Sequence, residues 1–465
     1  MDVFTLHSRI IKDLKSDAKV KRISLEKLDK YIKNFSSDDF VFENMEPSFQ
    51  EIFKKNIHSK FINLNNSEYP GHKVIFKEWF EGFIDRDNDI IYKLQKSFHG
   101  ALWEIYLFSI LKQKGLMVDF CKSSSPDFII TSPIKICIEA CVSNVQEKDN
   151  KPLVTDRDRR LKSDNLSLKK PLWKEDESKI KEILDEAIIR YSNAISKKHK
   201  LYNDKYLKKD FVRNNPYLLA LTSYSQLNYG RENHYGALAT FFGKYLIKTE
   251  QGYSYLEKEK IIKKGGAEID VNLFNYKNKN GEYEYNYISA VIFSSKVSLG
   301  KITTLAEQLD IQYKKNSNYI FHIYEDLENG EIDLLQVTRY INENLLEESI
   351  VKEISNVFLE IDYNPENISN LKNELSKNSQ EQAEQYDLMD GLFILHNPNA
   401  EIKISMELFD HHRIVQIYQD STTGELKFYK NSKTLVSSFN YPWFMYPEND
   451  PIGFQNLVKE NFNSI

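Results

Sequence analysis

The chain has little cysteine and no long apolar run. Three cysteines among 465 residues are too few for a disulfide framework, and this small, odd number indicates a reducing cytoplasm. No stretch of the sequence approaches the roughly 18 consecutive apolar residues of a transmembrane helix, so no membrane association is expected. The N-terminal residues lack the basic and apolar segments of a secretory signal, which also predicts a cytoplasmic protein.

The sequence also lacks a strong excess of positive charge. A formal net charge of −5 gives no general attraction for nucleic acid, so such a partner would require a local basic surface. The absence of a glycine-rich phosphate loop argues against nucleotide hydrolysis of the P-loop type. What is present, 41% hydrophobic and 13% aromatic residues, suffices for the cores of two or three structural units.

The sequence pattern divides the chain into three parts. Residues 1–95 are expected to form a helical N-terminal region, because their apolar residues recur at helical spacing. Residues 96–245 read as helix, strand, strand, a polar insertion at 145–174, a long helix and a strand at 217–221. That order predicts an α/β (α+β) unit with a mixed sheet. Residues 246–465 are expected to be an α+β extension of this unit.

The C-terminal part carries several local strand signals. Asn280-Gly281 lies between two tyrosine-rich or apolar segments, 271–276 and 283–288, which is typical of a β-hairpin. The polar residues 370–386 predict a solvated helix or linker. Four further strands are expected at Ala290–Phe293, Tyr319–Ile323, Leu392–Leu395 and Ile414–Tyr418.

Three carboxylates stand out between residues 100 and 144. Glu104 lies in an expected helix, 100–114, Asp127 follows Pro126 at the start of a short apolar strand, and Glu139 lies within the next strand. Two strands that each present a carboxylate can bring both to one edge of a small sheet. Hard divalent cations such as Mg²⁺ bind such oxygen ligands and keep several waters for chemistry.

Successive side chains of the expected strand that carries Glu139 alternate between its two faces. Cys137, Glu139 and Cys141 share one face, so Glu139 is expected to point away from the apolar, helix-packed side. An ionised carboxylate among apolar neighbours needs a partner or a metal. An alternative stays open, in which Asp127 caps a turn after Pro126 and Glu139 forms an ion pair at a sheet edge.

The segment Phe98–Leu107, followed by Pro126-Asp127 and by Glu139, resembles the core of the restriction-endonuclease-like superfamily, the PD-(D/E)XK nucleases. The resemblance implies a mixed-sheet core in which Asp127 and Glu139 bind Mg²⁺, with Glu104 completing the shell, and Mn²⁺ able to substitute. It also implies hydrolysis of phosphodiester bonds.

One position departs from that family pattern. The residue two positions after the strand glutamate should be lysine, and here it is Cys141, which cannot supply the charge. A lysine of the long helix is the candidate replacement, because residues 190, 194, 198 and 202 share one helical face. Lys198 is the first choice. The alternatives are a merely solvated basic face and a domain that has lost catalysis.

A nucleic-acid-binding surface is predicted from basic residues in and after the insertion. Phosphate contacts supply most non-specific affinity, although acidic residues interrupt this run and a solvated loop remains an alternative. The candidates are Arg157, Arg159, Arg160, Lys162, Lys169, Lys170 and Arg190.

Together these features predict a cytoplasmic, metal-dependent nuclease that acts on DNA first and RNA second. Defence against foreign nucleic acid is the role that the resemblance to free-standing nucleases of this superfamily implies. Two other classes stay open: a catalytically inactive nuclease fold that binds nucleic acid, and a sensor or effector subunit regulated by a protein partner. The sequence leaves open whether the chain forms a homo-oligomer.

Overall fold

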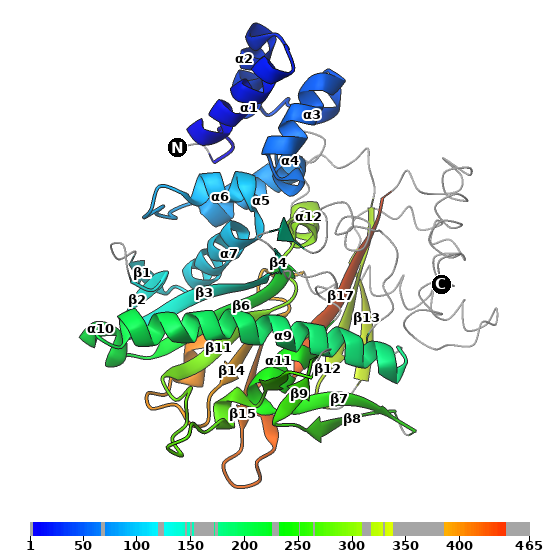
Figure 1. Ribbon diagram of the computed structural model, residues 1–465. Helices are drawn as coiled ribbons and strands as arrows, with labels where there is room; N and C mark the ends of the chain where they lie inside the picture. Colours follow the sequence, from blue (N-terminus) through cyan, green and yellow to red (C-terminus); the bar gives the residue numbers. More distant parts are fainter. Residues whose placement is uncertain are drawn as a thin grey trace, which may run out of the picture.

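The computed structural model describes residues 3–66, 70–119, 125–144, 147–148, 151–152, 172, 175–225, 232–250, 252–263, 266–308, 318–328, 331–337 and 386–442. Within them, helices surround one large sheet that contains parallel and antiparallel strands (Figure 1), which confirms the predicted α/β (α+β) class. Most of the polar insertion and nearly all of the predicted polar helix or linker at 370–386 lie outside the described residues.

The described part of the first 96 residues consists of helices and turns. Polar side chains cap the first turn of three of them: His7 at α1, Ser24 at α2 and His58 at α4. The Ser24 hydroxyl, for example, accepts a hydrogen bond from the Lys27 amide. Figure 1 shows these helices stacked above α7. They are α1 (Ser8–Val20), α2 (Leu25–Asn34), α3 (Pro47–Asn56), α4 (Ser59–Asn65), α5 (Pro70–Phe80) and α6 (Ile90–Lys96), with the short 3-10 turn η1 (Phe42–Asn44).

The central sheet has the strand order β1-β2-β3-β6-β11-β14-β15-β16. Its centre is parallel, because β3, β6 and β11 run in one direction, whereas β1–β2, β2–β3 and β11–β14 are antiparallel pairs. The sheet continues across residue 245, since β11 pairs with β6. Its strands are β1 (Met117–Asp119), β2 (Phe128–Ser132), β3 (Ile136–Asn144), β6 (Tyr217–Ser225), β11 (Ile288–Ser294), β14 (Leu392–His396), β15 (Ile414–Gln419) and β16 (Leu426–Phe428).

The two faces of the central sheet are covered by different helices. The side chains of Ile138, Leu218 and Ile292 form one core with α7 (His99–Gln113) and the N-terminal helices. The alternate residues of the same strands form a second core with α9 (Glu177–Leu201) and α11 (Tyr235–Phe242). Parallel strands buried on both faces read as continuous apolar runs, as these do.

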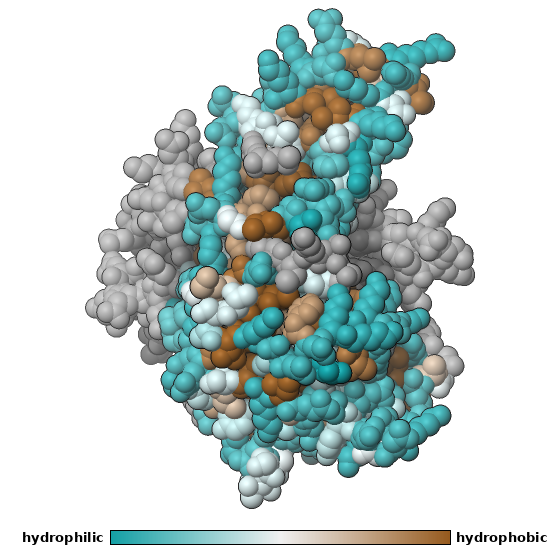
Figure 2. Space-filling model, turned by 90° about the vertical axis from the view of Figure 1, so that its left-hand side faces the viewer, coloured by the Kyte–Doolittle hydropathy of each residue, from teal (hydrophilic) through white to brown (hydrophobic). Residues whose placement is uncertain are grey.

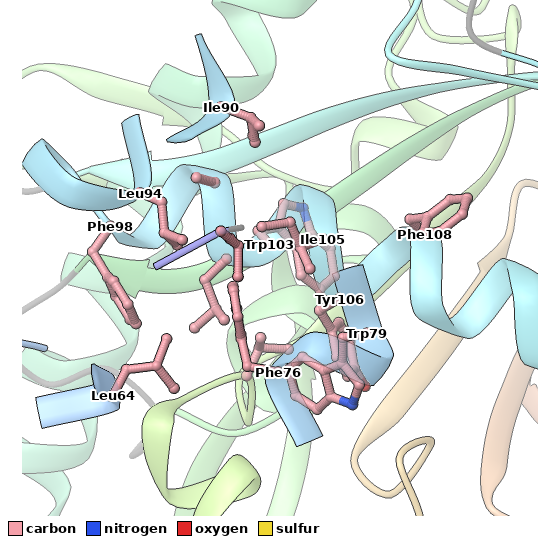
Figure 3. Packing of buried hydrophobic residues seen from close by; sticks show 14 of the residues in the cluster. Leu64, Phe76, Trp79, Ile90, Leu94, Phe98, Trp103, Ile105, Tyr106 and Phe108 are labelled. Carbon is pink, nitrogen blue, oxygen red and sulfur yellow. The ribbon is translucent and has the colours of Figure 1, made fainter. Parts of the chain in front are cut away.

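Helix α7 is apolar almost all round, as expected of a helix enclosed by protein. Its Trp103 is fully buried, and the indole Nε1 donates a hydrogen bond of 3.0 Å to the Ala220 carbonyl of β6. In Figure 3, Trp103, Ile105 and Tyr106 lie among side chains of α5 and α6, which include Trp79 and Leu94. This packing joins the N-terminal helices to the sheet.

The four further strands predicted in the C-terminal part are confirmed as parts of β11, β12, β14 and β15. The hairpin predicted around residues 280–281 is wrong in its strands. Leu273–Asn275 form a 3-10 turn (η4) packed against Phe241, so burial of these side chains overrides the strand pattern. A single bridge, Lys277 to Tyr283, joins the two sides of the turn.

No described helix has the length and apolarity required to cross a membrane. Figure 2 shows a largely hydrophilic face with apolar patches between polar groups.

The remaining described elements lie outside the central sheet. A three-stranded sheet has the order β13-β12-β17, and β7–β8, β9–β10 and β4–β5 are separate pairs. The remaining elements are β4 (Glu147–Lys148), β5 (Lys151–Pro152), η3 (Tyr202–Tyr206), α10 (Asp210–Arg213), β7 (Lys244–Thr249), β8 (Gly252–Glu257), β9 (Lys260–Ile262), β10 (Glu268–Asp270), α12 (Leu299–Gln308), β12 (Asn318–Asp326), β13 (Glu331–Val337), η7 (Met406–Phe409) and β17 (Lys433–Pro442).

Trp103 tests the role of α7 in holding the molecule together. Trp103→Ala is expected to lower the free energy of unfolding by about 3–5 kcal/mol, because it leaves a large cavity between helix and sheet. Trp103→Phe should cost less. Val20, whose side chain is 80% exposed, provides the control: Val20→Ala should stay within about 0.5 kcal/mol of wild type. Urea unfolding measures all three, and a wild-type value for Trp103→Ala would contradict this account.

Candidate active site

Glu139 lies in the middle of β3, between β2 and β6, with only 3% of its surface exposed. It shares its face with Cys137 and Cys141, as the strand alternation predicted. The sequence predicts that Glu139 points away from the apolar, helix-packed side, and it does point away from α7. Its own face is also apolar and helix-packed, because α9 covers it. Glu139 is therefore a buried carboxylate that requires partners.

Both oxygens of Glu139 have a partner. The Lys198 ammonium lies 2.5 Å from Oε1, and the Tyr206 hydroxyl lies 3.0 Å from Oε2. Lys198 comes from the last turn of α9, and Tyr206 from the π-helical turn η3 that continues it. Such wider turns recur at functional sites because they redirect side chains. The structure thus brings the predicted lysine to the strand glutamate.

Asp127 lies immediately before β2. The β2–β3 register pairs Phe128 with Ile138, so its continuation by one residue places Asp127 opposite Glu139. The Ala140 amide donates a hydrogen bond of 2.7 Å to Asp127 Oδ2, whereas Oδ1 lies 3.8 Å from Arg86 Nη2. Asp127 is thus bound to the neighbouring strand rather than to a turn after Pro126. The other half of the alternative, an ion pair of Glu139, is present as the contact with Lys198, although β3 lies inside the sheet and not at its edge.

Arg86 is a site residue that the sequence analysis did not identify. It lies in the turn between α5 and α6, and its Nη1 donates a hydrogen bond of 3.2 Å to the Pro126 carbonyl. Its guanidinium places positive charge beside Asp127 and holds the chain that leads into β2. Arg86 therefore connects the N-terminal helices to the candidate site.

Glu104, on α7, completes the electrostatic cluster. It is half-buried, and burial raises the pKa of its carboxyl to about 8, an effect that Asp127 increases and Lys93 and Lys198 oppose. Burial likewise raises the pKa of Glu139 to about 7; Asp127 increases this shift and Lys198 opposes it. Carboxylates in these surroundings favour a proton or a cation beside them.

Lys198 is held in its charged form. Burial disfavours the ammonium, but the nearby carboxylates of Glu139 and Asp127 outweigh burial and raise its pKa above the ordinary value. Burial raises the pKa of the Cys141 thiol to about 12, so Cys141 supplies no charge at neutral pH. In its charged form Lys198 can stabilise negative charge nearby.

Of the other predicted basic residues, Arg190 is the one that the structure describes, and it does not lie at this site. Arg190 lies two turns before Lys198, roughly 12 Å along the α9 axis, and its Nη2 is 3.7 Å from Glu186 Oε1. The remaining six lie outside the described residues: Arg157, Arg159, Arg160, Lys162, Lys169 and Lys170.

A signal for Tyr206 was present in the sequence but incomplete. The helical face through residues 194, 198 and 202 continues to Tyr206, but the π-helical turn that sets its direction has no sequence signature. Arg86 stands between Asp85 and Asp87 in a polar turn, where no pattern separates it from a solvated residue.

Among the residues that the structure describes, no three His, Cys, Asp or Glu side chains converge closely enough to hold a metal ion as they stand. Asp127 and Glu139 form a two-carboxylate set, with Glu104 coupled to Asp127 by charge. Mg²⁺ is commonly held by one or two carboxylates, with waters and substrate phosphate completing its shell. The donor set therefore fits a magnesium ion that binds together with a substrate.

Comparisons with known proteins identify no relative: no family model, no curated protein and no solved structure matches this chain. The fold and the site define an α/β protein with a carboxylate–lysine cluster at the β2–β3 edge of a mixed sheet. The argument for function consequently depends on the geometry of this cluster.

The raised carboxyl pKa values predict a pH dependence of stability. In the unfolded chain Glu104 and Glu139 lose their protons near pH 4.5, whereas in the folded protein they do so near pH 8 and 7. The folded state therefore binds more protons between these limits, and the free energy of unfolding should fall as the pH rises from 5 to 8. Above pH 8 this contribution should level off.

Urea unfolding from pH 5 to 9 with EDTA measures this dependence. Glu104→Gln should flatten the decline by up to about 1.4 kcal/mol per pH unit for one proton. Glu81→Gln, at a side chain that is 82% exposed, is the control and should keep the wild-type slope. If the free energy of unfolding of Glu104→Gln depends on pH as steeply as that of wild type, the pKa of Glu104 is not raised in the folded protein.

Proposed function

We propose that this protein is a metal-dependent nuclease of the restriction-endonuclease-like type. The observation that carries the proposal is the contact between Lys198 and Glu139: a lysine from α9 reaches the strand glutamate where Cys141 leaves the family's usual lysine missing. The opposed Asp127 and the adjacent Glu104 support the same assignment.

Each side chain of the site would have a different role in the reaction. Asp127 and Glu139 would hold Mg²⁺ or Mn²⁺, and Glu104 would orient water beside them. The metal would supply Lewis acidity toward a phosphate oxygen and a more acidic bound water. Glu139 would have to exchange one of its two present partners to become a ligand. Lys198 would then be free to stabilise charge that develops on the scissile phosphate.

Two residues would act by positioning. Tyr206 donates its hydroxyl hydrogen toward Glu139 and limits the rotation of that carboxylate. Arg86 holds the Pro126 carbonyl and places charge near Asp127. Neither has to contact the substrate to contribute, because displacement of a reactive group by about 1 Å can cost about 100-fold in rate.

The proposed substrate is DNA, with RNA as the second choice, and the proposed setting is cytoplasmic defence against foreign nucleic acid. This biological role is an analogy with the superfamily. A homo-oligomer or a regulatory protein partner is compatible with the proposal, since an unregulated nuclease is toxic to its host.

A second candidate function is a catalytically inactive nuclease fold that binds nucleic acid. Cys141 in place of lysine favours it, as does the engagement of both Glu139 oxygens by protein groups. This alternative predicts nucleic-acid affinity that survives loss of Asp127, without cleavage in any metal.

Cleavage assays with Mg²⁺ and Mn²⁺ on plasmid, linear and single-stranded DNA and on RNA test the nuclease proposal. Asp127→Ala and Glu139→Ala should abolish cleavage. Lys198→Ala should lower the rate by about 10²–10³-fold, the scale of one lost electrostatic group. Lys197→Ala is the matched control, because Lys197 is exposed on the same helix and should be dispensable.

Cleavage that persists in both carboxylate variants would exclude this site. An equal loss of cleavage rate in Lys197→Ala and Lys198→Ala would show that Lys198 has no specific role at the site and that any basic residue on this surface has the same effect. If wild type cleaves none of these substrates but binds them, the inactive alternative is favoured.

A further inference from the structure

A second polar cluster is buried on the α9 side of the sheet, away from Glu139. Three consecutive residues before α11, Glu232, Asn233 and His234, are 1%, 4% and 1% exposed. Side chains of this kind are rarely buried without a specific reason. Asn233 also has a φ of 45°, in the left-handed region, so the turn is held in an uncommon conformation.

The cluster contains two hydrogen bonds between a tyrosine hydroxyl and a glutamate carboxylate. The Tyr191 hydroxyl of α9 lies 2.9 Å from Glu232 Oε1, and the Tyr235 hydroxyl of α11 lies 2.7 Å from Glu325 Oε1 on β12. The second oxygen of each carboxylate, Oε2, is buried and has no hydrogen-bond partner within 3.5 Å, and the same holds for His234 Nε2. The buried Ser223 hydroxyl is close enough to Glu232 to lower the pKa of its carboxyl, against the larger effect of burial. A buried polar atom without a partner costs about 1–3 kcal/mol.

Lys296 lies among these groups and donates a hydrogen bond to Asn233 Oδ1. Its position is made possible by Gly391, where an added Cβ would stand 2.6 Å from Lys296 Cγ. Burial lowers the pKa of Lys296 to about 8, and the charges of Glu232 and Glu325 oppose this shift. When both carboxylates are ionised, they face at most one positive charge from Lys296, so the cluster of these three side chains carries an excess negative charge.

The location resembles that of ligand sites in open α/β sheets. Lys296 follows the carboxyl end of β11, and Glu232 contacts Tyr191 beside the carboxyl end of the parallel neighbour β6. Ligands in such sheets bind beyond the carboxyl ends of parallel strands.

We propose that this cluster is a second binding site, for a small organic cation that carries N–H donors, such as an amine or guanidinium group. The orphaned Glu232 and Glu325 oxygens accept hydrogen bonds when ionised, so the occupant must donate. An ammonium or guanidinium group supplies both a positive charge and the N–H donors from which these oxygens can accept hydrogen bonds. Burial raises the pKa of both carboxyls, that of Glu325 to about 7, and a bound cation would oppose this shift.

Isothermal titration calorimetry at pH 8 with EDTA tests the site, with guanidinium and methylammonium chloride as probes and sodium chloride for ionic strength. Wild type should bind one probe saturably, with a Kd of about 1 mM or below. Tetramethylammonium, which has the same charge but no N–H donor, should not bind. Glu232→Gln should weaken binding about tenfold or more, whereas Glu182→Gln, at an exposed glutamate of α9, should not.

Circular dichroism checks that Glu232→Gln folds, and Glu325→Gln provides a second variant if it does not. Absence of saturable binding of either probe by wild type at about 10 mM would mean that ordered water alone occupies the cluster, and would overturn the proposal. Equal affinity in folded Glu232→Gln and Glu325→Gln would also overturn it, as would equal binding of tetramethylammonium.

Discussion

The buried charge of Glu139 is the constraint on which the candidate site depends. A carboxylate in the middle of a sheet, packed between helices, is costly unless positive charge and hydrogen bonds surround it. Lys198 and Tyr206 supply both, and each comes from the end of one helix, α9 or its π-helical continuation. The length and position of α9 therefore determine how Glu139 is paired, because a helix that ended before Lys198 would leave the Glu139 carboxylate without this partner.

The same constraint explains how distant parts of the chain meet. Residues from α7, from the α5–α6 turn, from the start of β2, from β3 and from the end of α9 converge around the β2–β3 pair of the central sheet. Helix α7, which carries Glu104, is held to the sheet by Trp103 and packs against α5 and α6 through its apolar surface (Figure 3). The turn between α5 and α6 places Arg86 beside Asp127. The second buried cluster, around Glu232 and Lys296, also contacts α9, because the Tyr191 hydroxyl of this helix donates a hydrogen bond to Glu232.

Much of this arrangement could be predicted from the sequence. Alternation along β3 gives the shared face of Cys137, Glu139 and Cys141, and helical spacing selects Lys198. Other features depend on tertiary packing that leaves no local pattern. Leu273 illustrates this, since its burial replaces a strand that the sequence favoured. Arg86, in a polar turn, becomes distinctive only when the fold places it beside Asp127.

The central claim is that Asp127 and Glu139 bind a catalytic divalent cation together. Anomalous diffraction from crystals grown with Mn²⁺ and a non-cleaved nucleic-acid analogue tests this claim most directly. We expect an anomalous peak within ligand distance of both carboxylates, with Lys198 moved from Glu139 toward a phosphate oxygen. No peak there, with nucleic acid bound and the Lys198–Glu139 ion pair intact, would contradict the metal-dependent account and favour an inactive nucleic-acid-binding fold.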